Sequence, residues 1–242
     1  MLISLIIQSY ERPDKLKGCL EYLKKNLLDG LRTVDYELTV ADDGSVNPAV
    51  KDILGSQLCT DICHRVLITD DRSRGPGYLL NKACENLRGD FTIHIEDDFW
   101  LLNPMHEDDL FACFEAFSKI KTLELIRLRR IIGDASEKYR LNEYETGSEP
   151  GMYAFGGKEF RMFKLYKAGG PSYQYTGNAH VRRGDTWLRL GPYPEGVDIW
   201  GLENRYAARF RHKGFRTGRF KDGWFSHTAT ELSSTKYLKR EE

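Results

Sequence analysis

The sequence lacks a long hydrophobic run. No stretch of its 242 residues approaches 18 uncharged apolar residues, the length that a membrane-spanning helix needs. It also lacks a net charge, because 36 lysines and arginines balance 36 aspartates and glutamates. A balanced charge gives no reason to expect attraction to nucleic acid or to an anionic membrane. We therefore expect no nucleic-acid partner and no transmembrane segment, and peripheral contact with a membrane surface stays open.

Cysteine is scarce and its count is odd. The five cysteines are Cys19, Cys59, Cys63, Cys84 and Cys113. The apolar start at residues 1–7 carries no basic residue and runs directly into polar residues 8–12, so we interpret it as a buried strand and not as a secretion signal. An odd cysteine count without such a signal predicts reduced thiols and a cytoplasmic location. Cys59, Cys63 and His64 are neighbours, but their spacing matches no common zinc site.

The first hundred residues alternate between strand and helix patterns. Apolar runs predict strands at residues 2–8, 36–40, 66–68 and 91–95. Apolar residues spaced three and four apart predict a helix between Pro13 and Gly30 and another over residues 78–87. Alternating strands and helices imply right-handed crossovers, so we expect an α/β fold with a mostly parallel central sheet flanked by helices.

The rest of the chain is less regular. We expect helices over residues 106–119 and 202–213, a strand over 123–129, and loops with short strands over 133–175. No internal repeat or low-complexity segment is visible, and we predict a single domain over residues 1–230, with its two halves meeting near residue 100. A polar tail over residues 231–242 follows it.

Polar clusters follow three of the expected strands, at Gln8 to Arg12, Asp42 to Ser45 and Glu96 to Asp98. Ligands of parallel sheets bind beyond the carboxyl ends of the strands, so we expect these clusters to meet at one rim. Three adjacent acids after a buried strand repel one another, and a divalent cation relieves that repulsion. Hard oxygen ligands select Mg²⁺ or Mn²⁺. The alternative interpretation is a solvated acidic turn.

Two further segments could bind a nucleotide. The turn that contains Asp42 and Asp43 offers acceptors for a base or ribose, although an ordinary Asp-Gly turn explains it equally well. Arg72 and Arg74 lie in a glycine-containing loop before a helix, which suits a diphosphate, and the alternative is a plain polar loop.

Two late segments could contact an acceptor or a metal. Asp198 to Asn204 opens a helix and supplies a carboxylate that could act as a general base, with Trp200 able to stack on a sugar face. Capping of the helix explains the acidic residues as well. His227 is more often structural than a ligand, unless the fold returns it to the three acids.

Taken in order, these segments resemble the GT-A-fold glycosyltransferases, and most closely their inverting family 2. The resemblance covers about residues 1–230. It rests on these segments: Ile6 to Pro13, Ala41 to Ser45, Glu96 to Asp98, Gly177 to Asp185 with Leu190 to Tyr193, and Trp200 to Asn204. The middle acidic segment stands where the family has its D-x-D metal motif, and the last one resembles its acidic E-D motif.

The resemblance implies a role for each matching residue. The nucleotide-sugar donor is expected to contact Ser9, Tyr10, Arg12, Asp42 or Asp43, Arg72 or Arg74, Glu96 and Asp97. The metal, Mn²⁺ or Mg²⁺, is expected at Asp98, Glu96 and His227. The acceptor is expected at Trp200, Asn178 and Arg182. The implied reaction moves a sugar, from a UDP-sugar in preference, to a carbohydrate or other hydroxyl acceptor with inversion.

The sequence departs from the family pattern at two positions. Glu96 stands where Asp is commoner, which adds one methylene of reach. Asn204 stands where the family has the acid usually assigned as catalytic base, and an amide cannot accept a proton in that role. We therefore assign the base to Glu203, with Asp198 as the alternative.

Three other functions compete with this interpretation. A retaining GT-A transferase uses the same donor half without a dedicated base. A nucleotidyltransferase would show a glycine-rich, lysine-containing loop after its first strand, where this chain has residues 9–13. An inactive module that binds a nucleotide sugar would keep the donor residues and lack transfer.

Overall fold

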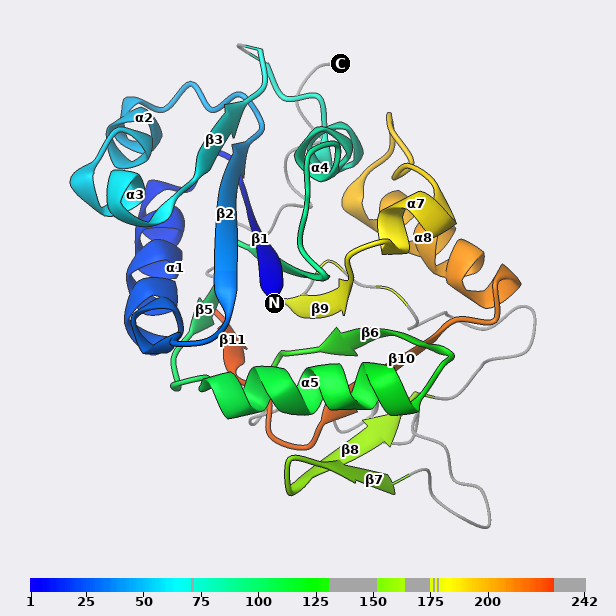
Figure 1. Cartoon of the computed structure of the whole chain (residues 1–242). Helices are drawn as coiled ribbons and strands as arrows, with labels where there is room; N and C mark the ends of the chain where they lie inside the picture. The colour runs from blue at the N-terminus through cyan, green and yellow to red at the C-terminus, as the bar shows by residue number, and fades with distance from the viewer. Residues whose placement is uncertain (71, 131–151, 164–174, 176, 178, 229–242) are drawn as a thin grey trace.

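The computed structural model describes residues 1–70, 72–130, 152–163, 175, 177 and 179–228 (Figure 1). The elements of the first half are β1 (Leu2–Ser9), α1 (Pro13–Asn26), η1 (Leu28–Gly30), β2 (Asp35–Asp42), α2 (Pro48–Leu54), α3 (Gln57–Ile62), β3 (Arg65–Ile68), α4 (Pro76–Cys84), β4 (Phe91–Glu96) and β5 (Phe99–Leu101). Those of the second half are α5 (Glu107–Lys119), β6 (Leu123–Arg127), β7 (Met152–Phe155), β8 (Lys158–Met162), β9 (His180–Arg183), α7 (Thr186–Leu190), α8 (Ile199–His212), β10 (Arg216–Phe220) and β11 (Phe225–His227).

Within the described residues, nine strands form one sheet in the order β3-β2-β1-β4-β9-β6-β10-β8-β7, and β5 pairs with β11 in a small second sheet. Strands β3, β2, β1 and β4 are parallel, as the sequence predicted. Strand β9 runs antiparallel to both β4 and β6, and β8 runs antiparallel to β10 and β7. The α/β fold is confirmed, and its sheet is mixed because the second half inserts these antiparallel strands.

The local sequence explains why the main elements form. Strand β1 is apolar over most of its length and its interior residues are buried, as expected for a strand covered on both faces. Helix α1 has Pro13 in its first turn and buries Leu16, Cys19, Leu20 and Leu23 at helical spacing. Helices α2 and α3 were not predicted, because each has at most 7 residues and too few turns for a clear periodicity.

Helices cover both faces of the sheet (Figure 1). Residues from α1, α2, α3 and α5 share one hydrophobic cluster with the sheet, and residues from α4 and α8 share a second cluster on the other face. The last residues of β1, β2 and β4 belong to neither cluster, and they lie at the rim where ligands of such sheets bind.

Asn81 joins the two halves of the chain. Its side chain, on α4, donates to the carbonyl of Tyr193 at 3.0 Å and to Glu195 at 2.7 Å, and it accepts the N–H of Tyr193 at 2.6 Å. Gly77, one turn earlier, lies against the backbone of Pro194, where a side chain would not fit. These contacts place the segment before α8 next to the start of α4.

The longest described helices, α1 and α8, have 14 residues each. A bilayer-spanning helix needs about 20 apolar residues. Over the part of the chain that the structure describes, none of the helices is long and apolar enough to cross a membrane.

We predict that Glu107→Gln lowers the stability of the fold above about pH 4.5. The carboxylate accepts the backbone N–H groups of Thr33 and Arg32 at 2.6 Å each and of Val34 at 2.9 Å. These bonds hold the pKa of Glu107 near 2, below its ordinary value of 4.5. A lowered folded-state pKa stabilises the protein above the unfolded-state pKa, and this stabilisation is lost as the pH falls towards 2.

Urea unfolding of the wild type and of Glu107→Gln at pH 7, 4.5 and 3 measures this effect. The difference in unfolding free energy should shrink as the pH falls. Asp108→Asn, an exposed neighbour in the same helical turn, should change stability less. A difference that stays constant from pH 7 to 3 would contradict the assignment.

Candidate functional site

The three polar clusters predicted at the strand ends meet in one cleft with an empty volume of about 840 Å³, open solvent at its mouth included. The cleft is lined by Gln8, Ser9, Tyr10, Arg12, Asp43, Ser73, Gly75, Pro76, Glu96, Val197, Asp198 and Ile199. The strand register explains the convergence, because Ser9 pairs with Asp42 and Gln8 pairs with Glu96.

Arg12 holds together the two acids at the centre of the site. Its guanidinium forms an ion pair with Asp97 and another with Asp98, the latter at 2.7 Å. Ser9 donates a further hydrogen bond to Asp97 at 3.0 Å. Asp97 and Asp98 are 0% and 5% exposed, so Arg12 supplies the positive charge that two buried carboxylates require.

The fold brings His227 next to Asp98. The sequence made His227 a candidate metal ligand only if the fold brought it back to the three acids. Its Nε2 lies 3.4 Å from Asp98 Oδ2, and its ring stacks on Phe99 with 4.7 Å between centroids. Thr228 fixes this return, since its N–H and hydroxyl both donate to the carbonyl of Asp98, at 2.7 and 2.9 Å. The end of β11 is therefore attached to the acidic segment.

The donor atoms at Asp98 fit a divalent cation. Asp98 Oδ1 is buried and accepts no hydrogen bond, while Oδ2 faces Arg12 and His227. A carboxylate oxygen and an imidazole nitrogen together suit Mn²⁺. Within the described residues, no group of three or more His, Cys, Asp or Glu side chains is arranged to hold a metal ion. A cation here would therefore take further ligands from a bound diphosphate or from water.

Glu96 and Glu203 lie on either side of Gly177. The N–H of Gly177 donates to the carboxylate of Glu203, and a side chain at position 177 would overlap with a carboxylate oxygen of Glu96. Glu203 lies in the second turn of α8 and Glu96 at the end of β4. The fold thus places the candidate base of the second half next to the acidic segment of the first half.

The acids of this site differ in their affinity for protons. Burial, together with the charges of Asp98 and Glu203, raises the pKa of Glu96 to about 8. Burial raises the pKa of Asp97 to about 7, against the opposing effect of Arg12. Burial also works to raise the pKa of Asp98, but His227 and Arg12 outweigh it and hold that pKa below its ordinary value. Asp98 is therefore the acid that keeps its negative charge.

Asp42 and Asp43 shape the cleft in different ways. Asp42 accepts the N–H and hydroxyl of Ser45, both at 2.7 Å, so it closes its own turn. Asp43 lines the cleft and accepts the backbone N–H groups of Arg74 at 3.0 Å and Gly75 at 2.9 Å. Asp43 thereby positions the loop before α4 and is the better placed of the two acids to meet a ligand.

The two candidate diphosphate residues, Arg72 and Arg74, are not among the residues that line the cleft. Arg74 pairs with Asp70 and lies over the ring of Tyr78, with its guanidinium carbon 4.8 Å from the ring centre. Arg72 is exposed and neither arginine lines the cleft. Arg12 is the basic residue that lines it.

Asp198 lines the cleft and also caps α8 by accepting the N–H of Gly201 at 2.6 Å. The capping role considered from the sequence is therefore present, and it ties up one carboxylate oxygen. Trp200 is 57% exposed at the start of the same helix, where its ring is free to meet a solvent-borne molecule.

Arg182 requires a correction. It was expected to contact the acceptor, but it is 1% exposed in the interior beneath α8. Its guanidinium donates to the sulfur of Cys84 at 3.1 Å and lies 5.7 Å from the ring centre of Tyr193. An acceptor cannot reach a side chain buried in this way, so Arg182 is structural. Asn178, the other residue of that segment, lies outside the described residues.

Sequence reasoning missed the part played by Glu11. This residue has a φ of 55°, a left-handed conformation that is uncommon for a residue with a side chain. Its N–H donates to Ser45 at 2.7 Å, and its carboxylate accepts the N–H of Val46 at 2.6 Å. The turn after β1 is thereby tied to the turn after β2. No local pattern signals this contact, because it depends on the pairing of the two strands.

Solved structures with similar folds are glycosyltransferases of the GT-A class. The chain superposes with a TM-score of 0.66 and 16% identity on S. aureus TarS 1-349 in complex with UDP-GlcNAc, covering 98% of this chain and 61% of that one. It superposes with a TM-score of 0.62 and 14% identity on the mannosyltransferase PcManGT from Pyrobaculum calidifontis in complex with GDP-Man and Mn²⁺, covering 96% and 58%. These similarities establish the GT-A fold predicted from the sequence.

The family follows from the sequence match. The model of glycosyl transferase family 2 matches residues 4–182, and the chain belongs to that family. EpsH of Bacillus subtilis (strain 168), which its name describes as a glycosyltransferase, is 28% identical over 99 residues, or 41% of this chain and 26% of EpsH. The chain thus spans about a quarter of that relative and about three fifths of the two solved structures.

We predict that Gly177→Ala destabilises the fold by about 1 kcal/mol, the low end of the usual cost of overpacking a close contact. The new methyl group would push against a carboxylate oxygen of Glu96, which is the end of a flexible side chain and can move at low cost. Gly30→Ala is the matched control, because nothing lies within 4 Å of the added carbon there. Urea unfolding of both variants measures the effect. Equal stabilities of the two variants would show that Glu96 moves aside freely.

Proposed function

We propose that this protein transfers a sugar from a nucleotide-diphosphate donor, UDP-sugar in preference, to a hydroxyl acceptor, with a divalent metal and with inversion at the anomeric carbon. The observation that carries the proposal is that Tyr10, Asp43, Arg12 and Glu96 line one cleft of a family 2 domain. Asp98 pairs with Arg12, and Glu203 lies near Glu96. The similar structures were solved with UDP-GlcNAc and with GDP-Man and Mn²⁺, which favours a nucleotide sugar and a metal here.

Each residue of the cleft has a separate part in this reaction. Tyr10 offers its ring to the base, and Asp43 holds the loop that covers the ribose side of the cleft. Asp98, with His227 beside it, would hold Mn²⁺ or Mg²⁺. The metal supplies Lewis-acid stabilisation of the charge on the leaving diphosphate. Arg12 keeps Asp98 oriented and adds positive charge at the same place.

Glu203 is the proposed base. It lies near Glu96, which lines the cleft, and there it would accept the proton of the acceptor hydroxyl during attack. Asp198 is the alternative, but one of its carboxylate oxygens already accepts the N–H of Gly201 as a helix cap, so it is the less suitable base. Asn204, at the position of the usual family acid, is exposed on α8. Trp200 would stack on the acceptor sugar. The cytoplasmic location expected from the cysteines stays a prediction.

An inactive sugar-nucleotide-binding module stays the second candidate, because Asn204 replaces the usual acid. Such a module would bind the nucleotide sugar in the same cleft as a transferase, but it would not transfer the sugar. A retaining transferase differs in the product anomer, which NMR of the product identifies.

We predict that a nucleotide diphosphate or its sugar conjugate raises the melting temperature only with Mn²⁺ or Mg²⁺ present. Ligands that bind the folded state stabilise it by mass action, by about 2.7 kcal/mol at one hundred times the dissociation constant. A thermal-shift screen of UDP, GDP and their sugar conjugates, with and without metal, measures this. Asp98→Asn should remove the metal-dependent part of the shift, because the amide removes the charge that binds the cation.

Asp108→Asn serves as the matched control, since it makes the same exchange on α5, away from the cleft. A full metal-dependent shift in Asp98→Asn would refute the metal assignment. The absence of any shift with every nucleotide in the wild type would refute the donor assignment.

We predict that Glu203→Gln lowers turnover by about 10²–10⁴-fold, the usual contribution of a general base. The amide keeps the size of the side chain and cannot take the proton, so the dissociation constant of the nucleotide should change little. Turnover and nucleotide affinity are measured in parallel with the donor that the thermal-shift screen identifies. Asn204→Asp is the companion variant, and an activity gain there would move the base to position 204.

A further inference from the structure

Trp100 lies two residues after Asp98 and has no part in the proposed reaction as described so far. It is the middle residue of β5, and its side chain is half-buried against α1. Its indole N–H donates to two carbonyl oxygens, that of Lys15 at 3.1 Å and that of Asp97 at 3.2 Å. One side chain therefore joins the first turn of α1 to the acidic segment.

Gly18 provides the space in α1 that the ring of Trp100 occupies. A side-chain carbon at position 18 would overlap with this ring, which is rigid and is held by its N–H. Glycine inside a helix is unfavourable for the helix, so its presence here fits a need for close approach. Tyr22, one turn further along α1, stacks on the same ring with 5.4 Å between the centroids.

The position of α1 determines where Arg12 lies. Arg12 is the N-cap residue of this helix, and its guanidinium pairs with Asp97 and with Asp98. Trp100 belongs to the same chain segment as these two acids, while its ring is fixed on α1. Trp100 therefore holds the two sides of these ion pairs at a defined separation.

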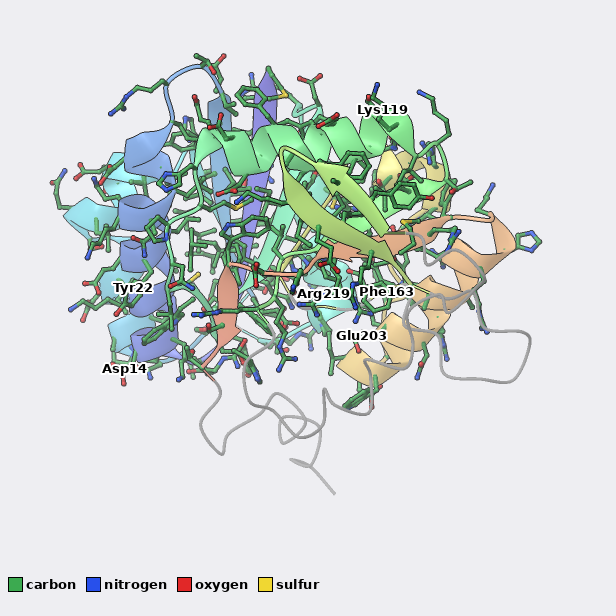
Figure 2. The ribbon with its side chains drawn as sticks, turned by 90° about the horizontal axis from the view of Figure 1, so that it is seen from below. Asp14, Tyr22, Lys119, Phe163, Glu203 and Arg219 are labelled. Carbon is green, nitrogen blue, oxygen red and sulfur yellow. The ribbon has the colours of Figure 1, made fainter. Side chains whose placement is uncertain are left out.

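The same contacts reach His227. Strand β11, which ends at His227, pairs with β5, and Figure 1 and Figure 2 both show α1 beside this small sheet. The ammonium of Lys15 lies 5.3 Å from the ring centre of Trp100 and donates to the carbonyl of Thr228. Thr228 in turn donates to the carbonyl of Asp98. Trp100 thus lies where α1, the acidic segment and the end of β11 meet.

We propose that Trp100 is a positioning residue of the metal site, which holds Arg12, Asp98 and His227 in the arrangement that binds a divalent cation. This inference rests on the proposed transferase function, because that function includes the cation. Trp100 does not line the cleft, so it acts through the carbonyl of Asp97 and through α1. A tryptophan that only filled the core would contribute to stability and would leave the affinity for the metal unchanged.

Titration with Mn²⁺, followed by electron paramagnetic resonance, tests this inference, because free and bound Mn²⁺ give different signals. The wild type and each variant are titrated with UDP or GDP present, whichever the thermal-shift screen selects. Trp100→Phe keeps an aromatic ring and removes the N–H. We expect it to raise the dissociation constant of Mn²⁺ about three- to ten-fold, the usual effect of losing a hydrogen bond. Excess Mn²⁺ should restore nucleotide binding to the wild-type level.

Gly18→Ala tests the same contact from the side of α1, and it carries the test if Trp100→Phe does not fold. The added methyl group must displace the ring, so the affinity for Mn²⁺ should fall at least as much as in Trp100→Phe. Trp187→Phe is the matched control. It makes the same exchange and removes an N–H that donates to Asn81 at 3.1 Å, on α7 and outside the residues that line the cleft. It should lower the melting temperature and leave the affinity for Mn²⁺ unchanged.

Wild-type affinity for Mn²⁺ in a folded Trp100→Phe or Gly18→Ala variant would overturn the inference, and so would an equal loss of affinity in Trp187→Phe. A loss of nucleotide binding that excess Mn²⁺ does not restore would also overturn it, since the defect would then lie outside the metal site. Failure of the proposed function has a different signature, because the wild type itself would bind no Mn²⁺ with either nucleotide.

Discussion

The site depends on the way one arginine compensates two buried carboxylates. Asp97 and Asp98 follow directly after β4, and Arg12 follows β1, so their ion pairs join the ends of two neighbouring strands. Without a cation, two adjacent acids in the interior would be costly. With Arg12 present they can stay buried, and Asp98 keeps its charge and one oxygen that accepts no hydrogen bond. This single contact fixes the two acids at the place where we propose that a metal and a diphosphate bind.

The second half of the chain adds side chains to the site that the strand ends of the first half form. Asn81 fixes the segment before α8 against α4, and Thr228 fixes the end of β11 against Asp98. As a result, Glu203 and His227 reach the acidic segment from opposite parts of the second half. The first half is built from parallel strands. The second half adds antiparallel strands to the same sheet.

Local sequence patterns predicted most of the donor half. The apolar run of β1, the helical spacing of α1 and the acids after β2 and β4 are signals within a few residues of each other. They were sufficient because parallel strands joined by helices have few arrangements, and all of them place the strand ends together. The same reasoning failed for Arg182, since the pattern of β9 does not show that α8 covers this face.

The sequence by itself determined the class of fold, the order of the motifs and the identity of the acids, because these depend on periodicity and residue chemistry. Only the tertiary structure decided which side chains meet: that Arg12 pairs with Asp97 and Asp98, that Asp42 closes its own turn, and that Arg74 faces Asp70. The physical reason is that strand register and helix packing fix contacts between residues tens of positions apart, and no local pattern encodes them.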